Sequence, residues 1–153
     1  MITGLISINK PHTDNIFSEK KGLEWRKKPL PAGLYYVYET KNKGGCGMVI
    51  GEMQIEVSRS VDTSHPLPVW LVNAGCVHPA ALKRYANNGI IYANFIKNAK
   101  RYDKPKPLSA YGTKHKCNLS KKCTEQGFLC AGYCKLTRPP QSWCRVEELK
   151  DGR

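Results

Sequence analysis

The sequence predicts one α+β domain in which strands outnumber helices. Its 153 residues suit a single compact unit, long enough to bury about two thirds of the surface that the unfolded chain exposes. Most periodic segments alternate apolar and polar residues, which is the pattern of half-buried strands, and few segments have helical features. No internal repeat and no second domain is evident, so one domain is expected to span residues 1–153.

The first strand and the first helix are predicted near the beginning of the chain. Residues 4–9 alternate in hydrophobicity, and Pro11 follows them. Pro11 suits the first turn of a helix, and Ile16 belongs to an apolar stripe on that helix. Lys20 and Lys21 are expected at its C-terminal end, where cations complement the helix dipole.

The strand predicted at residues 23–26 is the most informative segment. Alternation places Glu24 and Arg26 on one face, while Leu23 and Trp25 point to the other. A hydrophobic core has no use for a charged face, so this face is expected to line a wet, charged cleft. A solvated edge strand, on which charges discourage unwanted pairing, is the alternative.

A β-hairpin is predicted from the two strand-like segments that come next. Residues 34–40 are rich in aromatic and β-branched side chains, residues 41–47 form a turn cluster, and residues 48–58 alternate again. Glu52 shares a face with polar residues of the second arm. It therefore either joins the charged side of the sheet or faces solvent.

The second half of the chain has fewer regular signals. Residues 66–79 are expected to be irregular, and residues 78–86 are expected to form a helix that ends at a Gly-containing cap. Residues 90–96 have strand character, and residues 142–147 are expected to form the closing strand. A Pro-rich and Cys-rich stretch at about 104–138 lacks a clear period and is expected to be a loop insertion on the surface.

Residues Glu19 to Arg26 resemble the Gly-Lys-Lys-Thr-x-Glu-x-Arg signature of the ASCH domain, a branch of the PUA-like superfamily of small β-barrels associated with RNA. The order of elements agrees, and residues 102–108 and 138–144 look like later landmarks of ASCH proteins encoded by phages and prophages. The resemblance implies a PUA-like small mixed β-barrel with flanking helices. Glu19 stands where the family usually has Gly and Gly22 where it usually has Thr, so chemistry that needs the Thr hydroxyl is not expected.

The charge balance favours a polyanionic partner. Lysine and arginine total 25 against 12 acidic residues, a net charge of +13. A basic belt with one acid, Asp103, is consistent with phosphate contacts, although lysines that keep a loop solvated are the alternative. A membrane surface is disfavoured because no amphipathic helix accompanies the charge. The nine basic residues of the belt are Lys97, Lys100, Arg101, Lys104, Lys106, Lys114, Lys116, Lys121 and Lys122.

The charged strand suggests a nucleic-acid site, with RNA favoured over DNA. Lys21 or Arg26 would hold a phosphate, and Glu24 would accept hydrogen bonds from a base edge. Aromatic residues such as Tyr36 or Trp25 could stack on that base. The full set of candidate nucleic-acid-binding residues is Lys20, Lys21, Glu24, Arg26, Tyr38, Lys97, Lys100, Arg101 and Trp143.

Catalysis is the second hypothesis for this cluster, with Lys21, Glu24 and Glu52 as candidate catalytic residues. Some ASCH-like proteins are amidohydrolases that act on acylated cytidines, with a lysine and a hydroxyl nucleophile on this strand, whereas here Glu24 stands at the nucleophile's position. Hydrolysis would then need a water activated by Glu24 or Glu52. Other ASCH proteins are described as ribonucleases. A third hypothesis is a phage protein-interaction factor acting on host defence or transcription.

A structural zinc site is the only cofactor that the sequence suggests. Cys117, Cys123, Cys130 and Cys134 could bring four thiolates together in the irregular stretch and give it order. Their spacing is not that of a paired Cys-x-x-Cys site, so free thiols are the alternative. His115 and Cys144 lie near this cluster in the sequence, whereas His12, His65 and His78 show no ligand spacing and receive no role here.

We expect a soluble, cytoplasmic protein, encoded by a phage or prophage in a bacterial host. No apolar run reaches the roughly 18 residues that span a bilayer, and the beginning of the chain lacks the layout of a signal peptide. An odd number of cysteines, seven, argues for reduced thiols rather than a disulfide framework. Protein partners remain possible, and the sequence does not indicate an oligomeric state.

Overall fold

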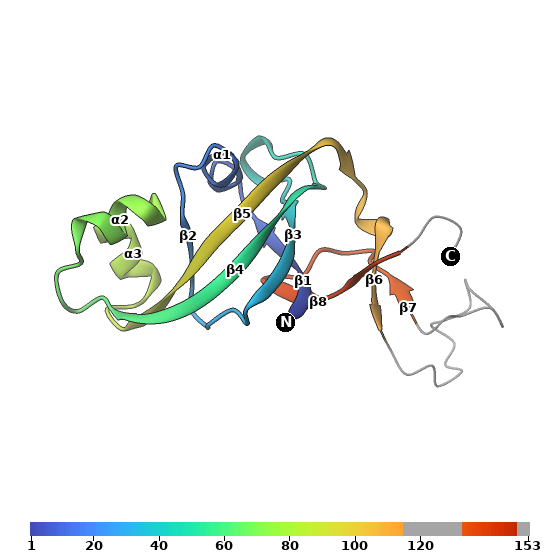
Figure 1. Cartoon of the computed structure of the whole chain (residues 1–153). Coiled ribbons are helices and arrows are strands. Elements are labelled where there is room, and N and C mark those ends of the chain that lie inside the picture. The colour runs from blue at the N-terminus through green and yellow to red at the C-terminus, as the bar shows by residue number, and fades with distance from the viewer. Residues whose placement is uncertain (115–132, 150–153) are drawn as a thin grey trace.

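The computed structural model describes residues 1–114 and 133–149. Figure 1 shows a twisted sheet dominated by the long strands β4 and β5, with a pair of helices at one end and a small second sheet at the other. The helices are α1 (His12–Phe17), α2 (Val69–Gly75) and α3 (Pro79–Tyr85), with short 3-10 turns at Asn42–Gly44 and Leu108–Ala110. The strands are β1 (Ile2–Ile8), β2 (Leu23–Arg26), β3 (Gly33–Glu39), β4 (Met48–Asp62), β5 (Ile90–Lys106), β6 (Tyr111–Lys114), β7 (Tyr133–Lys135), β8 (Trp143–Arg145) and β9 (Glu147–Glu148).

The main sheet has six strands in the order β2-β5-β4-β3-β1-β8. Strands β1 and β3 run parallel, and the other neighbours are antiparallel. A three-stranded sheet, β7-β6-β9, lies beside it. This α+β arrangement confirms the predicted fold class, although the backbone pairing within the described residues leaves β2 and β8 as edges rather than closing a barrel.

Three apolar clusters stabilise the fold. The inner face of the main sheet contributes buried residues such as Ile6, Val37 and Met53, and α1 adds Ile16 to the same cluster. Helices α2 and α3 cover the outer face of β2 and β5 through a second cluster, which includes Leu23, Trp25, Leu71, Leu82, Ile91 and Ala93. The third cluster joins β1, β3 and β4 to β6, the middle strand of the small sheet.

Several predicted elements are confirmed. The hairpin is present as β3 and β4, and the helix of residues 78–86 is α3, which Asn87 and Asn88 end in left-handed conformation. The closing strand is β8, paired antiparallel with β1. These segments had the clearest periodicity or capping signals in the sequence.

Other predictions need correction. Residues 66–79 are not irregular, because α2 forms within them and buries Leu71. Lys20 and Lys21 lie beyond the end of α1, so they do not neutralise its last turn. The described parts of the stretch 104–138 contribute the end of β5 and the strands β6 and β7, and Tyr111 of β6 is fully buried in the third apolar cluster.

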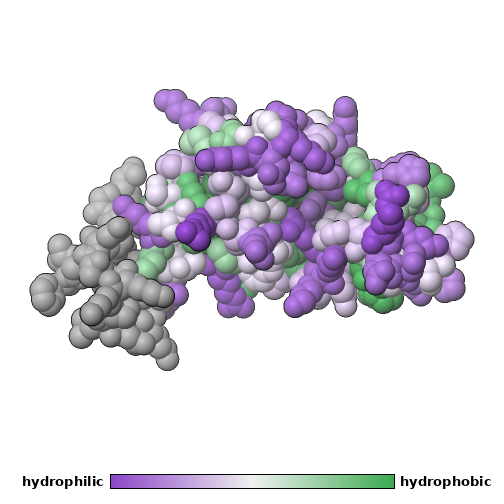
Figure 2. Space-filling view, turned by 180° about the vertical axis from the view of Figure 1, so that it is seen from behind, coloured by the Kyte–Doolittle hydropathy of each residue, from purple (hydrophilic) through white to green (hydrophobic). Residues whose placement is uncertain are grey.

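Hydrophobic surface gathers at the end of the molecule that carries α2 and α3 (Figure 2). Val69 and Trp70 of α2 are largely exposed, and the Trp70 ring stacks on Phe95 with centroids 6.5 Å apart. None of the helices in the described part of the chain has the length and apolar character needed to cross a membrane.

Asn94 joins β5 to β2 and to the segment that connects β2 with β3. It is fully buried, its Oδ1 accepts a hydrogen bond from the Leu30 N–H at 2.8 Å, and its Nδ2 donates to the carbonyl oxygen of Glu24 at 3.0 Å. This amide therefore fixes the strand that carries the charged residues against its neighbour.

Substituting Asn94→Ala should lower the free energy of unfolding by about 1–3 kcal/mol, because it leaves the buried N–H of Leu30 without its partner and removes the side-chain bond to the Glu24 carbonyl oxygen. Urea unfolding followed by tryptophan fluorescence measures the change. Asn73→Ala is the control, since Asn73 is exposed on α2 and should change stability by less than about 0.5 kcal/mol. Equal stability of both variants would contradict the assigned role.

Candidate functional site

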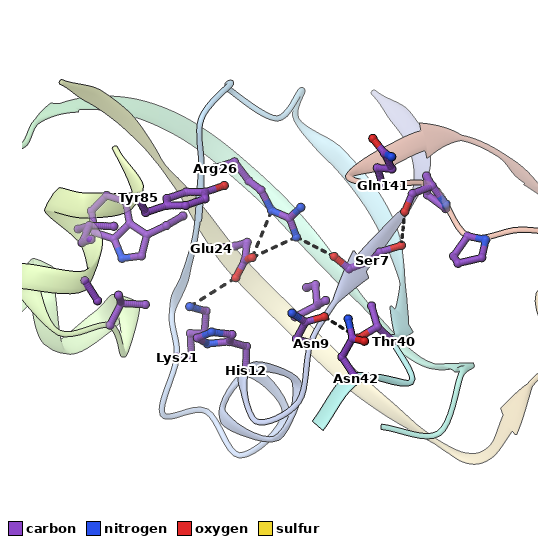
Figure 3. A pocket seen from close by; sticks show the side chains of 17 residues that line it. Ser7, Asn9, His12, Lys21, Glu24, Arg26, Thr40, Asn42, Tyr85 and Gln141 are labelled. Atoms are coloured by element: carbon purple, nitrogen blue, oxygen red, sulfur yellow. Dashed lines mark hydrogen bonds and ion pairs between the residues drawn. The ribbon is translucent and has the colours of Figure 1, made fainter. Parts of the chain in front are cut away.

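A cavity of about 680 Å³ lies between β2, α3 and the junction of β1 with α1. Figure 3 shows Lys21, Glu24 and Arg26 along one wall, with Ser7 and Asn9 of the β1 end facing them. Residues 139–141, which precede β8, complete the lining. The predicted charged cleft therefore exists, and β2 presents its charged face to it.

Glu24 lies between two cations at the centre of this wall. Its Oε1 is 3.1 Å from the nearer terminal nitrogen of Arg26 and also accepts a hydrogen bond from Arg26 Nε at 3.2 Å. Its Oε2 is 3.4 Å from Lys21 Nζ. Lys21 and Glu24 are only 3% and 7% exposed, so water screens these interactions weakly.

Arg26 reaches across the opening between the two edges of the main sheet. Arg26 belongs to β2, and its guanidinium donates a hydrogen bond to the carbonyl oxygen of Ser7 on β1 at 2.9 Å. It also donates to Ser142 Oγ, beside β8, at 3.2 Å. A side chain, rather than backbone pairing, therefore spans the gap at this end of the sheet.

Lys21, two residues before β2, connects this segment to the C-terminal end of α2. Its Nζ donates to the carbonyl oxygen of Gly75 at 2.7 Å, where a cation also suits the helix dipole. The helix approaches this closely because Gly75 has no side chain, since a Cβ there would lie 2.0 Å from Trp25 Nε1. The backbone N–H of Gly22 adds a bond to the carbonyl oxygen of Ala74 at 2.8 Å.

Among the residues that line the cavity, Glu24 Oε2 and His12 Nδ1 are buried without a hydrogen-bond partner in the described ranges, as is Trp25 Nε1, which lies against Gly75 of α2. Burial, followed by the nearby Lys21 ammonium, lowers the pKa of His12 and outweighs the opposite effect of Glu24. The imidazole is therefore neutral at neutral pH and offers one donor and one acceptor. Buried polar groups are normally paired, so the Glu24 and His12 atoms mark a place where a ligand can bind.

The fold resembles solved structures of an ASCH protein from Zymomonas mobilis. A tyrosine-to-phenylalanine mutant of that protein is 18% identical, with 96% of this chain and 91% of that chain covered and a TM-score of 0.63. The protein without a named mutation gives 18% identity, 95% and 87% coverage, and a TM-score of 0.62. The chain has the ASCH fold. At this identity the likeness establishes the fold and not the activity.

Sequence comparisons add nothing to this structural likeness, because no protein-family profile and no curated protein matches the chain. The residues that face the cavity of this ASCH fold therefore have to be judged from their own geometry.

Tyr85 is a cavity residue that the sequence reasoning missed. It ends α3, is 45% exposed and lines the cavity, and Lys27 Nζ lies 4.9 Å from the centroid of its ring. Ala81, one helical turn earlier, lines the same cavity. The spacing of four residues was visible in the sequence, but which way this face of α3 points depends on the packing of α3 against β2.

Two aromatic residues that were predicted to contact nucleic acid lie outside the cavity. Tyr38 is 5% exposed and packs in the third apolar cluster with Leu5 and Tyr111, so it offers no ring to a ligand in the cavity. Trp143 packs against the inner core, with its ring edge-on to Tyr35 at 5.7 Å. Neither side chain lines the cavity.

Glu52 also lies outside the cavity. In the sheet it pairs with Tyr36 on β3 and with Lys100 on β5. It therefore does not join Lys21 and Glu24 as a catalytic group. Tyr36 itself is 8% exposed and, like Glu52, belongs to another part of the sheet.

The described part of the basic belt is separate from the cavity. Lys97, Lys100 and Arg101 are exposed on β5, and none of them lines the cavity. Lys97 pairs with Glu56 at 3.5 Å, and Arg101 pairs with Asp14 at 3.6 Å. Two of the three cations thus have protein carboxylates nearby, which reduces their availability to phosphates.

The zinc hypothesis concerns residues that mostly lie outside the described ranges. Cys117, Cys123 and Cys130 fall between residues 114 and 133, whereas Cys134 lies in β7. Within residues 1–114 and 133–149, no group of three or more potential ligands is arranged to hold a metal ion. The four-thiolate site stays a prediction from the sequence.

Replacing Arg26 with alanine should destabilise the domain by about 3 kcal/mol, because it removes one partner of a nearly buried ion pair and the connection to β1. Lys21 still compensates Glu24, which keeps the loss at the lower end of the usual range. Chemical unfolding measures the change. Arg59→Ala is the control, since Arg59 is exposed and has no ion pair with the described residues. A loss below about 0.5 kcal/mol for Arg26→Ala would refute the bridging role.

Proposed function

We propose that this protein binds single-stranded RNA by taking one base into the cavity at β2. The observation that carries the proposal is a cavity that combines a buried carboxylate, two cations and an exposed aromatic ring at its mouth. Proteins read single-stranded RNA with such groups, through stacking on aromatic rings and hydrogen bonds to base edges. The ASCH fold agrees with this class of partner.

Tyr85 is the proposed stacking residue, in place of Tyr38 and Trp143. Its ring is exposed on one side of the cavity, while the Lys27 ammonium lies over it. A base entering the cavity could stack on this ring, and Lys27 would then turn to a neighbouring phosphate. Tyr85 and Lys27 would thus contact a base and a backbone phosphate of the same RNA molecule.

The remaining cations near β2 provide the electrostatic attraction. Lys20, Lys27 and Lys28 are exposed at the two ends of this strand, and none forms an ion pair with a carboxylate of the described residues. Each cation that neutralises a phosphate releases counterions, so affinity should fall as salt rises. The net charge of +13 supports the same interaction.

Tyr85→Ala should weaken binding of a fluorescein-labelled single-stranded RNA by about 5- to 150-fold, the range expected for losing one stacked base. Fluorescence anisotropy at two salt concentrations measures the affinity, and DNA of the same sequence tests the preference for RNA. Trp70→Ala is the matched control, because Trp70 is also an exposed aromatic residue but does not line the cavity. Equal weakening by both variants, or by neither, would count against base binding in the cavity.

Hydrolysis of a bound nucleoside or RNA is the second candidate function. It is favoured by Glu24 Oε2, which is buried and has no hydrogen-bond partner within the described residues, and by the neutral imidazole of His12 in the same cavity. Such a carboxylate can accept a proton from an attacking water. Glu52 has no part in this version, since it lies elsewhere in the sheet.

The hydrolase candidate predicts more than one product molecule per protein molecule when N4-acetylcytidine or a short RNA is supplied in excess. Chromatography of the products measures turnover, and Glu24→Gln should abolish it while Glu52→Gln should not. Binding without turnover on this panel would leave RNA binding as the function.

A further inference from the structure

One buried carboxylate oxygen of a cavity residue still needs a hydrogen-bond donor. Glu24 Oε1 is occupied by Arg26, whereas Oε2 is buried and makes no hydrogen bond within the described ranges. Lys21 Nζ, 3.4 Å away, forms an ion pair with it but directs its hydrogen bond to Gly75 at 2.7 Å. A ligand that fills the cavity must therefore bring an N–H or O–H group to this oxygen.

The groups beside Glu24 restrict that ligand further. Figure 3 shows Glu24 between Lys21 and Arg26 on the cavity wall. Ammonium and guanidinium groups only donate hydrogen bonds. Lys21 has three N–H groups and donates one of them to a hydrogen bond within the protein. Arg26 has five and donates three. The wall thus presents a donor, an acceptor and a donor in turn.

We infer that the cavity selects uracil among the RNA bases, with Glu24 as the specificity-determining residue. This inference rests on the proposed function. The imide edge of uracil carries an N3–H between two carbonyl oxygens, which is an acceptor, a donor and an acceptor. Uracil therefore places its donor on Glu24 Oε2 and its carbonyls toward Lys21 and Arg26.

The other bases match this wall less well. Cytosine and adenine have an unprotonated ring nitrogen at the centre of the same edge, and its lone pair would face the carboxylate. Guanine has a ring N–H, but the amino group beside it would face a cation. Each mismatch either leaves the buried carboxylate oxygen unpaired or places two acceptors or two donors against each other, and both are costly for buried groups.

The test compares labelled oligoribonucleotides of about ten residues by fluorescence anisotropy. The probes are oligo(U), oligo(C), oligo(A) and an oligo(U) in which every base is N3-methyluracil. The methylated probe keeps both carbonyls and the stacking surface but lacks the N3–H donor. Wild-type protein should bind oligo(U) at least about tenfold more tightly than the methylated and the oligo(C) probes.

Variants then assign the preference to Glu24. Glu24→Gln can turn either its oxygen or its NH2 group toward the base, so the preference for oligo(U) over oligo(C) should fall below about threefold. Glu56→Gln is the control, because Glu56 is an exposed carboxylate outside the cavity, paired with Lys97. A thermal melt checks folding, and the methylated probe on wild-type protein decides the question even if Glu24→Gln is unstable.

The outcomes separate this inference from the proposed function. Similar affinity for all four probes, or a preference for oligo(C) or oligo(A), overturns uracil selection while RNA binding stands. No binding of any probe overturns both. Tight binding of oligo(U) that is lost on N3-methylation supports both.

Discussion

The ion cluster of Lys21, Glu24 and Arg26 is the interaction on which the site depends. Arg26 links β2 to β1 and to the segment before β8, and Lys21 links β2 to the end of α2. Buried ion pairs contribute little net stability, because desolvation offsets their attraction. What they provide here is position, since the guanidinium that pairs with Glu24 also donates to Ser7 of β1 and to Ser142 before β8, and the ammonium donates to Gly75 at the end of α2. The cavity is the space that this arrangement leaves beside α3.

The cavity also contains buried polar atoms that lower the stability of the fold unless a ligand pairs with them. Glu24 Oε2 and His12 Nδ1 are buried in it without hydrogen bonds to the described residues, and such groups normally weaken a fold. By contrast, both carboxylate oxygens of the buried Glu39 accept hydrogen bonds from within the protein. Burial tends to raise its pKa, yet hydrogen bonds from Thr13 and Cys46 outweigh this and lower it. Glu39 is therefore a structural group, whereas Glu24 still has an oxygen to which a ligand can donate.

Periodicity in the sequence predicted the strands and the charged face of β2, because local alternation determines both. It could not predict the contents of the cavity. His12 and Tyr85 are far apart in sequence, and they line the same cavity only because α1 and α3 pack around β2. Glu52 and Tyr38 lie outside the cavity for a related reason, since the pairing of β3, β4 and β5 determines their neighbours. In β5, Asn98 adopts a positive φ of 51°, which interrupts the alternation and concealed the full length of that strand.

The two departures from the ASCH signature now have different meanings. Glu19 has a positive φ of 63° at the position where the family usually has Gly, so the backbone keeps the left-handed conformation that Gly favours and Glu adopts at a cost of about 1 kcal/mol. Gly22 replaces Thr, and a Cβ there would meet nothing within 4 Å. Steric crowding therefore does not require Gly at this position, and the missing hydroxyl is a chemical difference rather than a structural one. Chemistry at β2 then falls to Lys21, Glu24 and Arg26 with His12, a set suited to holding a base edge without a hydroxyl nucleophile.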